Sequence, residues 1–196
     1  MGRYLGPKAK LCKRVGVNIF GSAKYTKILA KYKQVKRGFK KVSEYSVQLK
    51  EKQLARYMYG VSEKQFKRYF NKASRAEGVT GMELLRFLER RIDNVLYRAG
   101  FALTRPQARQ MISHGHFELN GQRITVPSVM IKVGDIITLR KKMHNSPLYV
   151  VVSSLKPAKW IKFDSKKNSI EITRIPQDDE LEKVINEQSI VEYYSR

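Results

Sequence analysis

The chain contains a single cysteine, Cys12, among its 196 residues. One cysteine excludes an internal disulfide and any zinc site built from several cysteines, and it is typical of a reducing compartment. No apolar run reaches the roughly 18 residues that a membrane-spanning helix requires. The first residues lack both the apolar core of a secretory signal and the Ser-rich amphipathic character of a transit peptide. We therefore expect the protein to work where it is made.

Acidic residues are scarce, with 17 Asp and Glu against 40 Lys and Arg. The resulting net charge of +23 exceeds what solubility requires and indicates a polyanionic partner, with nucleic acid ahead of a membrane surface. Residues 1–42 contain 13 Lys or Arg and no acidic residue, although apolar groups such as Leu11 and Val15 occur among them. We expect this basic N-terminal extension to become ordered on a polyanion, and its deletion to leave a folded protein.

Motifs for nucleotide or metal binding are also missing. The glycines of the first half interrupt predicted helices and form no Walker or dinucleotide motif. His114 and His116 have no nearby cysteine or suitably spaced carboxylate to complete a coordination sphere. Cys12 has cationic neighbours but no paired histidine, so we interpret it as a small, incidental residue. The sequence predicts neither a metal nor a cofactor.

Apolar residues at helical spacing predict three helices in the first half, over 43–60, 62–73 and 80–100. Ser62 begins one capping box with Gln65. Thr80 with Glu83 has the same spacing. Tyrosines on these helices present two alternatives, stacking on unpaired bases or packing in the core, and their helical spacing favours the core for most of them. They are Tyr45, Tyr57, Tyr59, Tyr69 and Tyr97.

The second half mixes a short helix with strands. Thr104 and Gln107 predict a capping box that opens a helix through residue 112, with Pro106 tolerated in its first turn. Asn120-Gly121 is a strong signal for a two-residue hairpin turn, because both positions require a positive φ. Alternating apolar residues predict strands at 116–119, 122–126, 136–139, 149–152, 160–163 and 169–173.

The sign of the charge reverses after Pro176. Six acidic residues follow against one lysine and one arginine: Asp178, Asp179, Glu180, Glu182, Glu187 and Glu192. Carboxylates would be poorly placed against phosphate. We expect this C-terminal segment to pack on the protein's own basic helices.

Arginines and polar residues gather around the start of the helix at 104 and the hairpin. A helix N-terminus offers backbone N–H groups to a phosphate, and arginines add bidentate hydrogen bonds. This combination predicts a surface that binds RNA by its phosphates and shape, with Asn120 equally explained as a turn residue. The candidate RNA-binding residues are Arg3, Tyr4, Lys8, Lys10, Lys13, Arg14, Lys50, Lys52, Gln53, Arg56, Lys64, Lys67, Arg68, Arg91, Arg98, Thr104, Arg105, Arg109, Gln110, Ser113, His114, Asn120 and Arg123.

A collinear set of motifs resembles the family of small-subunit ribosomal protein S-four, also called universal small-subunit protein four. The motifs are RIDNVLYRAG at 91–100, TRPQARQ at 104–110, SHG at 113–115 and Asn120-Gly121. The chain's start at 2–8, its helix at 45–53 and its end at 185–195 are similar as well. The resemblance implies an α+β fold: a basic N-terminal extension (1–42), a mainly helical domain (43–89 plus 176–196) and an inserted αL-type RNA-binding α/β domain (90–175).

The same resemblance implies a structural constituent of the small ribosomal subunit and no enzyme. It implies primary binding of 16S-type ribosomal RNA at a helical junction in the 5′ domain, nucleation of the subunit body, and a contribution to translational accuracy. The implied partners are this RNA, neighbouring proteins, chiefly small-subunit protein five, and messenger RNA near the channel through which it enters. The implied location is a bacterial cytoplasmic ribosome, or an organelle stroma or matrix if the protein is organelle-encoded.

Three positions depart from the family pattern. Many relatives hold zinc with four N-terminal cysteines, whereas this chain has only Cys12, so it resembles the zinc-free members. The segment at 35–42 is shorter or altered. Gln107 replaces the more usual Glu, which should keep the capping geometry.

Two other functions are alternatives to the ribosomal one. RNA pseudouridine synthases also carry αL modules, and Arg91-Ile92-Asp93 resembles their Arg-Leu-Asp signature. In those enzymes the catalytic Asp follows the module, whereas Asp93 begins it, and the residues that remain are too few for a catalytic fold. Asp93 is better explained as the partner of a neighbouring Arg. The other rival, a free regulatory or quality-control RNA-binding protein, would not need both the basic extension and the C-terminal return.

Overall fold

The computed structural model describes residues 4, 6–35, 43–146, 149, 157–164 and 167–196. The chain forms two compact units, Met1–Leu84 with Glu182–Arg196, and Leu85–Leu181. Residues of the second unit are thus inserted between two segments of the first. The bounds inferred from the sequence, 43–89 with 176–196 and 90–175, stay our prediction of the independently folding domains.

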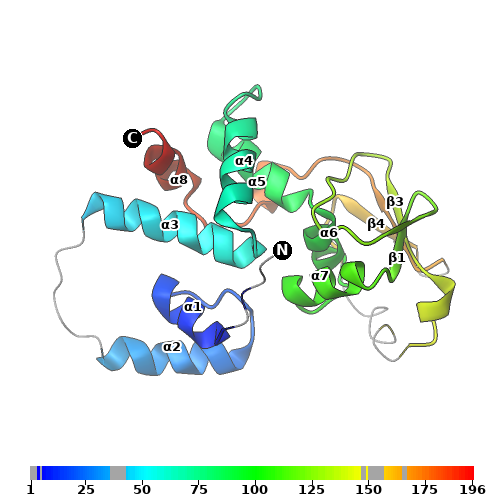
Figure 1. Ribbon diagram of the computed structural model, residues 1–196, viewed down its shortest axis with the longest axis horizontal. Coiled ribbons are helices and arrows are strands. Elements are labelled where there is room, and N and C mark those ends of the chain that lie inside the picture. Colours follow the sequence, from blue (N-terminus) through cyan, green and yellow to red (C-terminus); the bar gives the residue numbers. More distant parts are fainter. Residues whose placement is uncertain (1–3, 5, 36–42, 147–148, 150–156, 165–166) are drawn as a thin grey trace. The chain divides into compact units, whose positions relative to one another are not determined.

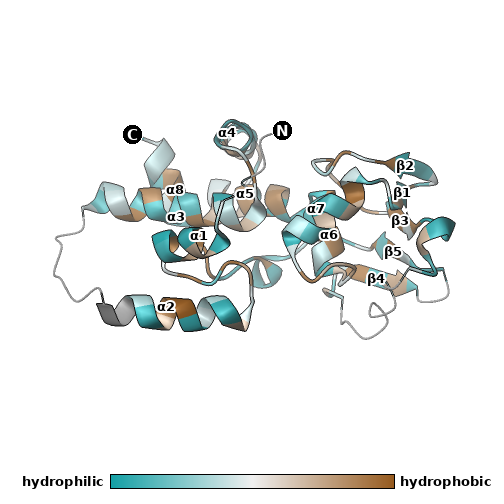
Figure 2. Cartoon of the chain, turned by 60° about the horizontal axis from the view of Figure 1, so that its bottom comes forward, coloured by the Kyte–Doolittle hydropathy of each residue, from teal (hydrophilic) through white to brown (hydrophobic). Residues whose placement is uncertain are grey.

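The first unit is helical (Figure 1). It contains α1 (Lys8–Val15), α2 (Ala23–Val35), α3 (Glu44–Tyr59), α4 (Glu63–Ala73), the start of α5 (Thr80–Glu89) and α8 (Glu187–Tyr194). Hydroxyl caps begin the central helices, because Ser43 Oγ accepts the N–H of Ser46 and Ser62 Oγ accepts the N–H of Gln65. Gly60 ends α3 in the left-handed region. The helices predicted at 43–60 and 62–73 are confirmed, and Figure 2 shows polar and apolar residues side by side along them.

The N-terminal extension packs on the helices of the first unit. α1 packs on α2 and α3, and buries Leu11, Cys12 and Val15. Arg14 Nη1 also donates to the hydroxyl of Tyr57 at 2.9 Å. The expectation that a polyanion is needed to order this segment is therefore wrong for residues 8–35, because its apolar stripe has a protein partner. Cys12 is a packing residue, and burial raises the pKa of its thiol.

The C-terminal segment returns to α3. Figure 1 shows α8 beside α3, where Gln48 Nε2 donates to Glu192 Oε2 at 3.0 Å and the ammonium of Lys52 lies 4.5 Å from the ring centre of Tyr193. Packing of this segment on a basic helix is thus confirmed for α8. The acidic residues before it pair within the second unit, Asp178 with Arg86 at 2.6 Å and Glu180 with an arginine, Arg174, that lowers the carboxyl pKa.

The single helix predicted over 80–100 is wrong. α5 ends at Glu89 and α6 (Ile92–Arg98) follows, separated by Arg90 and Arg91. The N–H of Ile92 donates to the carbonyl of Val129, and the N–H of Ile131 donates to the carbonyl of Arg90, each at 2.9 Å. Pairing with a distant segment therefore takes these backbone groups out of the helical ladder. Thr80 is the first residue of α5.

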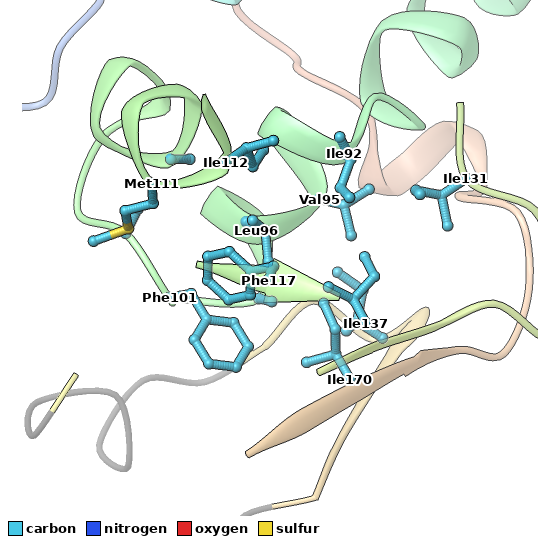
Figure 3. Packing of buried hydrophobic residues seen from close by; sticks show 14 of the residues in the cluster. Ile92, Val95, Leu96, Phe101, Met111, Ile112, Phe117, Ile131, Ile137 and Ile170 are labelled. Carbon is cyan, nitrogen blue, oxygen red and sulfur yellow. The ribbon is translucent and has the colours of Figure 1, made fainter. Parts of the chain in front are cut away.

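The second unit packs α6 and α7 (Arg105–Ser113) on an antiparallel sheet in the order β2-β1-β3-β5-β4. The strands are β1 (Phe117–Leu119), β2 (Gln122–Ile124), β3 (Ile136–Leu139), β4 (Ile161–Asp164) and β5 (Ser169–Ile172). Figure 3 shows the core, in which Phe117, Ile137 and Ile170 of the strands meet Val95 and Leu96 of α6. Core residues alternate along four of the strands, as the period-two pattern requires: 117 and 119 of β1, 137 and 139 of β3, 161 and 163 of β4, and 170 and 172 of β5.

The strand predictions agree with the structure with one exception. The hairpin is confirmed, with φ of 50° at Asn120, 80° at Gly121, and Leu119 paired with Gln122. The strands predicted at 136–139, 160–163 and 169–173 are present to within a residue or two. The strand predicted at 149–152 is wrong at Tyr149, which lies in a helical turn, and 150–152 fall outside the described residues.

Replacement of Leu11 by Ala should lower the free energy of unfolding by about 2–4 kcal/mol, because Leu11 is buried between α1 and its neighbours. Urea unfolding followed by circular dichroism measures this change. Lys10→Ala, at an exposed position of the same helix, should change the free energy by no more than about 0.5 kcal/mol. Equal stabilities of the two variants would mean that the extension is not part of the core.

Candidate nucleic-acid interface

The start of α7 agrees with the sequence prediction in its N-cap and its proline. Thr104 Oγ1 accepts the N–H of Gln107 at 3.3 Å, and Pro106 lies in the first turn. Gln107 Oε1 reaches back to accept the N–H of Leu103 at 3.0 Å. The N-cap half of the predicted capping box is thus present, but Gln107 bonds the N–H of Leu103 and not that of Thr104, which a capping box requires.

Asp93 lies at the start of α6 with its carboxylate buried between two arginines. Arg91 donates through Nε and Nη2 to the two carboxylate oxygens at 3.0 and 2.7 Å. Arg109, from α7, donates through Nη2 to Oδ2 at 2.7 Å. The prediction that Asp93 pairs with a neighbouring arginine is confirmed, and the contact with Arg109 ties α6 to α7.

Glu89 is a second buried carboxylate, which the sequence analysis missed. It accepts hydrogen bonds from Asn94 Nδ2 at 2.6 Å and from Nε and Nη2 of Arg98 at 2.9 and 2.8 Å. Arg105 donates through Nε to Asn94 Oδ1 at 2.6 Å, and its guanidinium lies 4.5 Å from the ring centre of Tyr97. The available signal was the position of Glu89, four residues after Leu85 on the apolar stripe of α5.

Two candidate RNA-binding residues are buried inside the protein. Arg91 is held by Asp93, and Lys52 donates to Glu63 Oε1 at 2.6 Å. Neither side chain can reach an RNA without unpacking its surroundings, so both are withdrawn from the interface. Lys52 lies four residues after Gln48, which is also buried, and helical spacing therefore places it on the inner face of α3.

Six further candidates are half-buried: Gln53, Arg56, Arg98, Thr104, Arg105 and Arg109. Those with charge bind carboxylates of their own unit, as Arg56 does with Glu63 at 3.7 Å. Their contribution to an interface is limited to the part of each side chain that solvent reaches.

The other described candidates are exposed. In the first unit they are Tyr4, Lys8, Lys10, Lys13, Arg14, Lys50, Lys64, Lys67 and Arg68; in the second they are Gln110, Ser113, His114, Asn120 and Arg123. Arg3 lies outside the described residues. The cations at 64, 67 and 68 share the outer face of α4, opposite the buried Phe66 and Tyr69.

Residues near the hairpin have internal roles as well. Asn120 Nδ2 donates to Asp135 Oδ1, and Asn120 Oδ1 accepts the N–H of Ile136, both at 2.9 Å. Of the two alternatives for Asn120, these contacts support the turn. Gly115 has a φ of 71°, and a Cβ at this position would collide with the guanidinium of Arg123. The glycine therefore lets that arginine lie across the backbone between α7 and β1.

The tyrosines are mostly internal, as predicted. Tyr59 and Tyr69 are buried, Tyr57 and Tyr97 are half-buried, and Tyr45 is exposed.

Within the part of the chain that the structure describes, no group of three or more His, Cys, Asp or Glu is placed to hold a metal ion. Among the same residues, none of the helices has the length and apolar character that crossing a membrane requires.

Comparison with known proteins gives matches along nearly the whole chain. Residues 3–89 match the family model described as the ribosomal protein S4/S9 N-terminal domain, and residues 90–137 match the S4 domain. The small ribosomal subunit protein uS4 of Persephonella marina is 46% identical over 204 residues and is covered in full, as is this chain. The proteins of the same name from Desulfitobacterium hafniense and Borrelia hermsii are 43% and 44% identical, with 100% and 99% of each covered by all of this chain.

The surroundings of His116 make the free energy of unfolding depend on pH. Its Nδ1 lies 2.8 Å from the hydroxyl of Tyr149, and burial, followed by the charges of His114 and Arg140, lowers its pKa. Burial also raises the pKa of Tyr149 to about 12. At a pH between the pKa of His116 in the folded protein and about 6.5, the unfolded chain binds more protons than the folded protein does. The contribution of neutral His116 to folding stability is therefore present above about pH 6.5 and is lost as the pH falls.

We expect His116→Gln to flatten the rise in unfolding free energy as the pH is raised towards 7, measured by urea unfolding at each pH. His114→Gln, at an exposed position, should retain most of the rise. A His116→Gln curve parallel to that of the wild type would contradict the assignment.

Proposed function

Because this chain belongs to the ribosomal protein S4 family, whose members are structural and not enzymatic, we propose that it is a structural constituent of the small ribosomal subunit that binds its ribosomal RNA. The observation that carries this proposal is the S4-domain match at 90–137, which coincides with α6, α7 and the β1–β2 hairpin. This segment holds guanidiniums and a helix N-terminus on a rigid core, which suits phosphate binding.

The charge of the two units supports an RNA partner. The exposed cations of α4 and of α1 lie on faces that point away from apolar cores. Three acidic residues of the C-terminal segment, in contrast, bind groups of the protein itself. Glu192 accepts from Gln48 of α3, and Asp178 and Glu180 pair with Arg86 and Arg174 of the second unit. Internal pairing of carboxylates leaves the excess of Lys and Arg available to phosphates.

The finer features of the proposal come from the family resemblance. We propose that the RNA site is a helical junction of the 5′ domain, that binding nucleates the subunit body, and that the protein contributes to translational accuracy. Protein five and messenger RNA near its channel of entrance are the proposed neighbours. The relatives described above come from bacteria, which supports a bacterial ribosome over an organelle.

Affinity for a transcript of the 5′ domain of small-subunit ribosomal RNA should fall by about three decades between 50 and 200 mM salt, if about six phosphates are neutralised. Filter binding across that range measures the effect. An affinity that does not change with salt would contradict phosphate binding.

Replacing Lys64, Lys67 and Arg68 together with Gln should reduce the slope of log affinity against log salt by about 2–3, since each lost phosphate contact removes about 0.7–0.9. The matched control removes the same charge at three other exposed lysines, Lys132, Lys159 and Lys183. Equal slopes for the two triple variants would place the RNA elsewhere than on α4.

Sedimentation of cell lysates through sucrose separates a ribosomal constituent from a free RNA-binding protein. We expect the protein to sediment with the small subunit and its precursors. A substantial fraction near the top of the gradient would instead favour the regulatory alternative.

A further inference from the structure

The second unit contains two buried carboxylates that share a cluster of four guanidiniums. The side chain of Glu89 is 1% exposed and that of Asp93 is 5% exposed. Arg98 and Arg105 lie on Glu89, and Arg91 and Arg109 lie on Asp93. We call these six residues the carboxylate–arginine cluster. Within the Glu89 half, Asn94 contacts both Glu89 and Arg105.

A buried carboxylate destabilises a fold unless it is paired and hydrogen-bonded. Glu89 and Asp93 meet this condition, but they do so with twice as many arginines as carboxylates. The cluster therefore retains positive charge. Two guanidiniums on one carboxylate repel each other, so each carboxylate holds its pair of arginines in place.

The two outer arginines of the cluster reach solvent. The side chain of Arg98 is 24% exposed and that of Arg109 is 22% exposed. Arg98 places Nε and Nη2 on the two oxygens of Glu89, while Arg109 places the same two nitrogens on Oδ2 of Asp93. Two contacts to one carboxylate fix the plane of a guanidinium. An arginine that is already fixed loses less conformational entropy when it meets a phosphate.

We propose that Glu89 and Asp93 are positioning residues for RNA binding, which hold the guanidiniums of Arg98 and Arg109 at the surface in the orientation that phosphates meet. This inference rests on the proposed function, because it assumes that the second unit binds ribosomal RNA. It assigns an RNA-binding role to two negatively charged residues that do not themselves touch the RNA.

The direction in which RNA affinity changes when Glu89 is replaced distinguishes positioning from simple electrostatics. Removing a negative charge from a strongly basic protein should strengthen its attraction to RNA. If Glu89 positions Arg98, however, its removal frees the guanidinium and leaves it to be repelled by its neighbours. Binding should then become weaker although the protein has become more positive.

The main experiment compares Glu89→Gln with Glu171→Gln by filter binding to the 5′ domain transcript. Both changes remove one negative charge from the second unit, but Glu171 is exposed on β5. We expect Glu89→Gln to bind about tenfold more weakly than the wild type, the equivalent of losing one charge-assisted hydrogen bond. Glu171→Gln should bind as the wild type does or more tightly. Binding by Glu89→Gln as tight as that by Glu171→Gln would overturn the inference.

Glu89→Asp tests position at constant charge. The side chain is shorter by one methylene, so its carboxylate cannot keep both Asn94 and Arg98 at their present distances. We expect binding at least about threefold weaker than that of the wild type, since one bidentate contact is lost. Wild-type affinity would mean that charge alone matters at this position.

A double-mutant cycle tests whether Glu89 acts through Arg98. Arg98→Gln should itself weaken binding, and adding Glu89→Gln should weaken it no further, because the group being positioned is already gone. Additive losses would overturn the inference. Thermal unfolding must show each variant folded at the temperature of measurement; if Glu89→Gln is not, Glu89→Asp with Arg98→Gln provides the same cycle.

The outcomes distinguish this inference from the proposed function. A wild-type protein that fails to bind the transcript would contradict the proposed function itself. A wild-type protein that binds, together with a Glu89→Gln variant that binds equally well, would refute only the positioning role.

Discussion

The buried pair of Arg91 and Asp93 is the interaction on which the second unit depends. It lies where α5 ends and α6 begins, beside the backbone bonds that join residues 90–92 to 129–131. In the first turn of α6, Asp93 Oδ2 accepts from Nη2 of Arg91 and also from Nη2 of Arg109 of α7. The pair thus ties the start of α6 to α7, and it is costly to break because each partner would remain buried and charged.

Local signals in the sequence predicted local structure well. Ser62 and Thr104 cap through residues three positions away, and Asn120-Gly121 turn the chain through their own positive φ, so these caps and this turn could be derived without knowing the fold. The break at Arg91 could not, since it depends on a segment almost forty residues later. The order of α1 was missed for a similar reason: a +23 chain suggests repulsion, whereas the apolar face of α1 finds α3.

In the candidate site, too, the sequence predicted local features and missed those that depend on the fold. Composition and motifs identified the exposed cations of α4 and the helix start at Thr104, because charge on the outer face of an amphipathic helix is visible in the sequence. They did not identify which cations are taken by carboxylates of the protein itself. Lys52 and Arg91 were therefore assigned to RNA, and Glu89 was overlooked, although its pairing decides how Arg98 is presented.

The return of α8 to α3 has a consequence for the order in which the protein is made. Residues 85–181 are synthesised before residues 182–196, and the first unit lacks one of its helices until α8 has been made. The usual order of folding during synthesis, in which the N-terminal domain folds first, is thus reversed for completion of the two units. The α/β unit therefore has all of its own residues before the helical unit does.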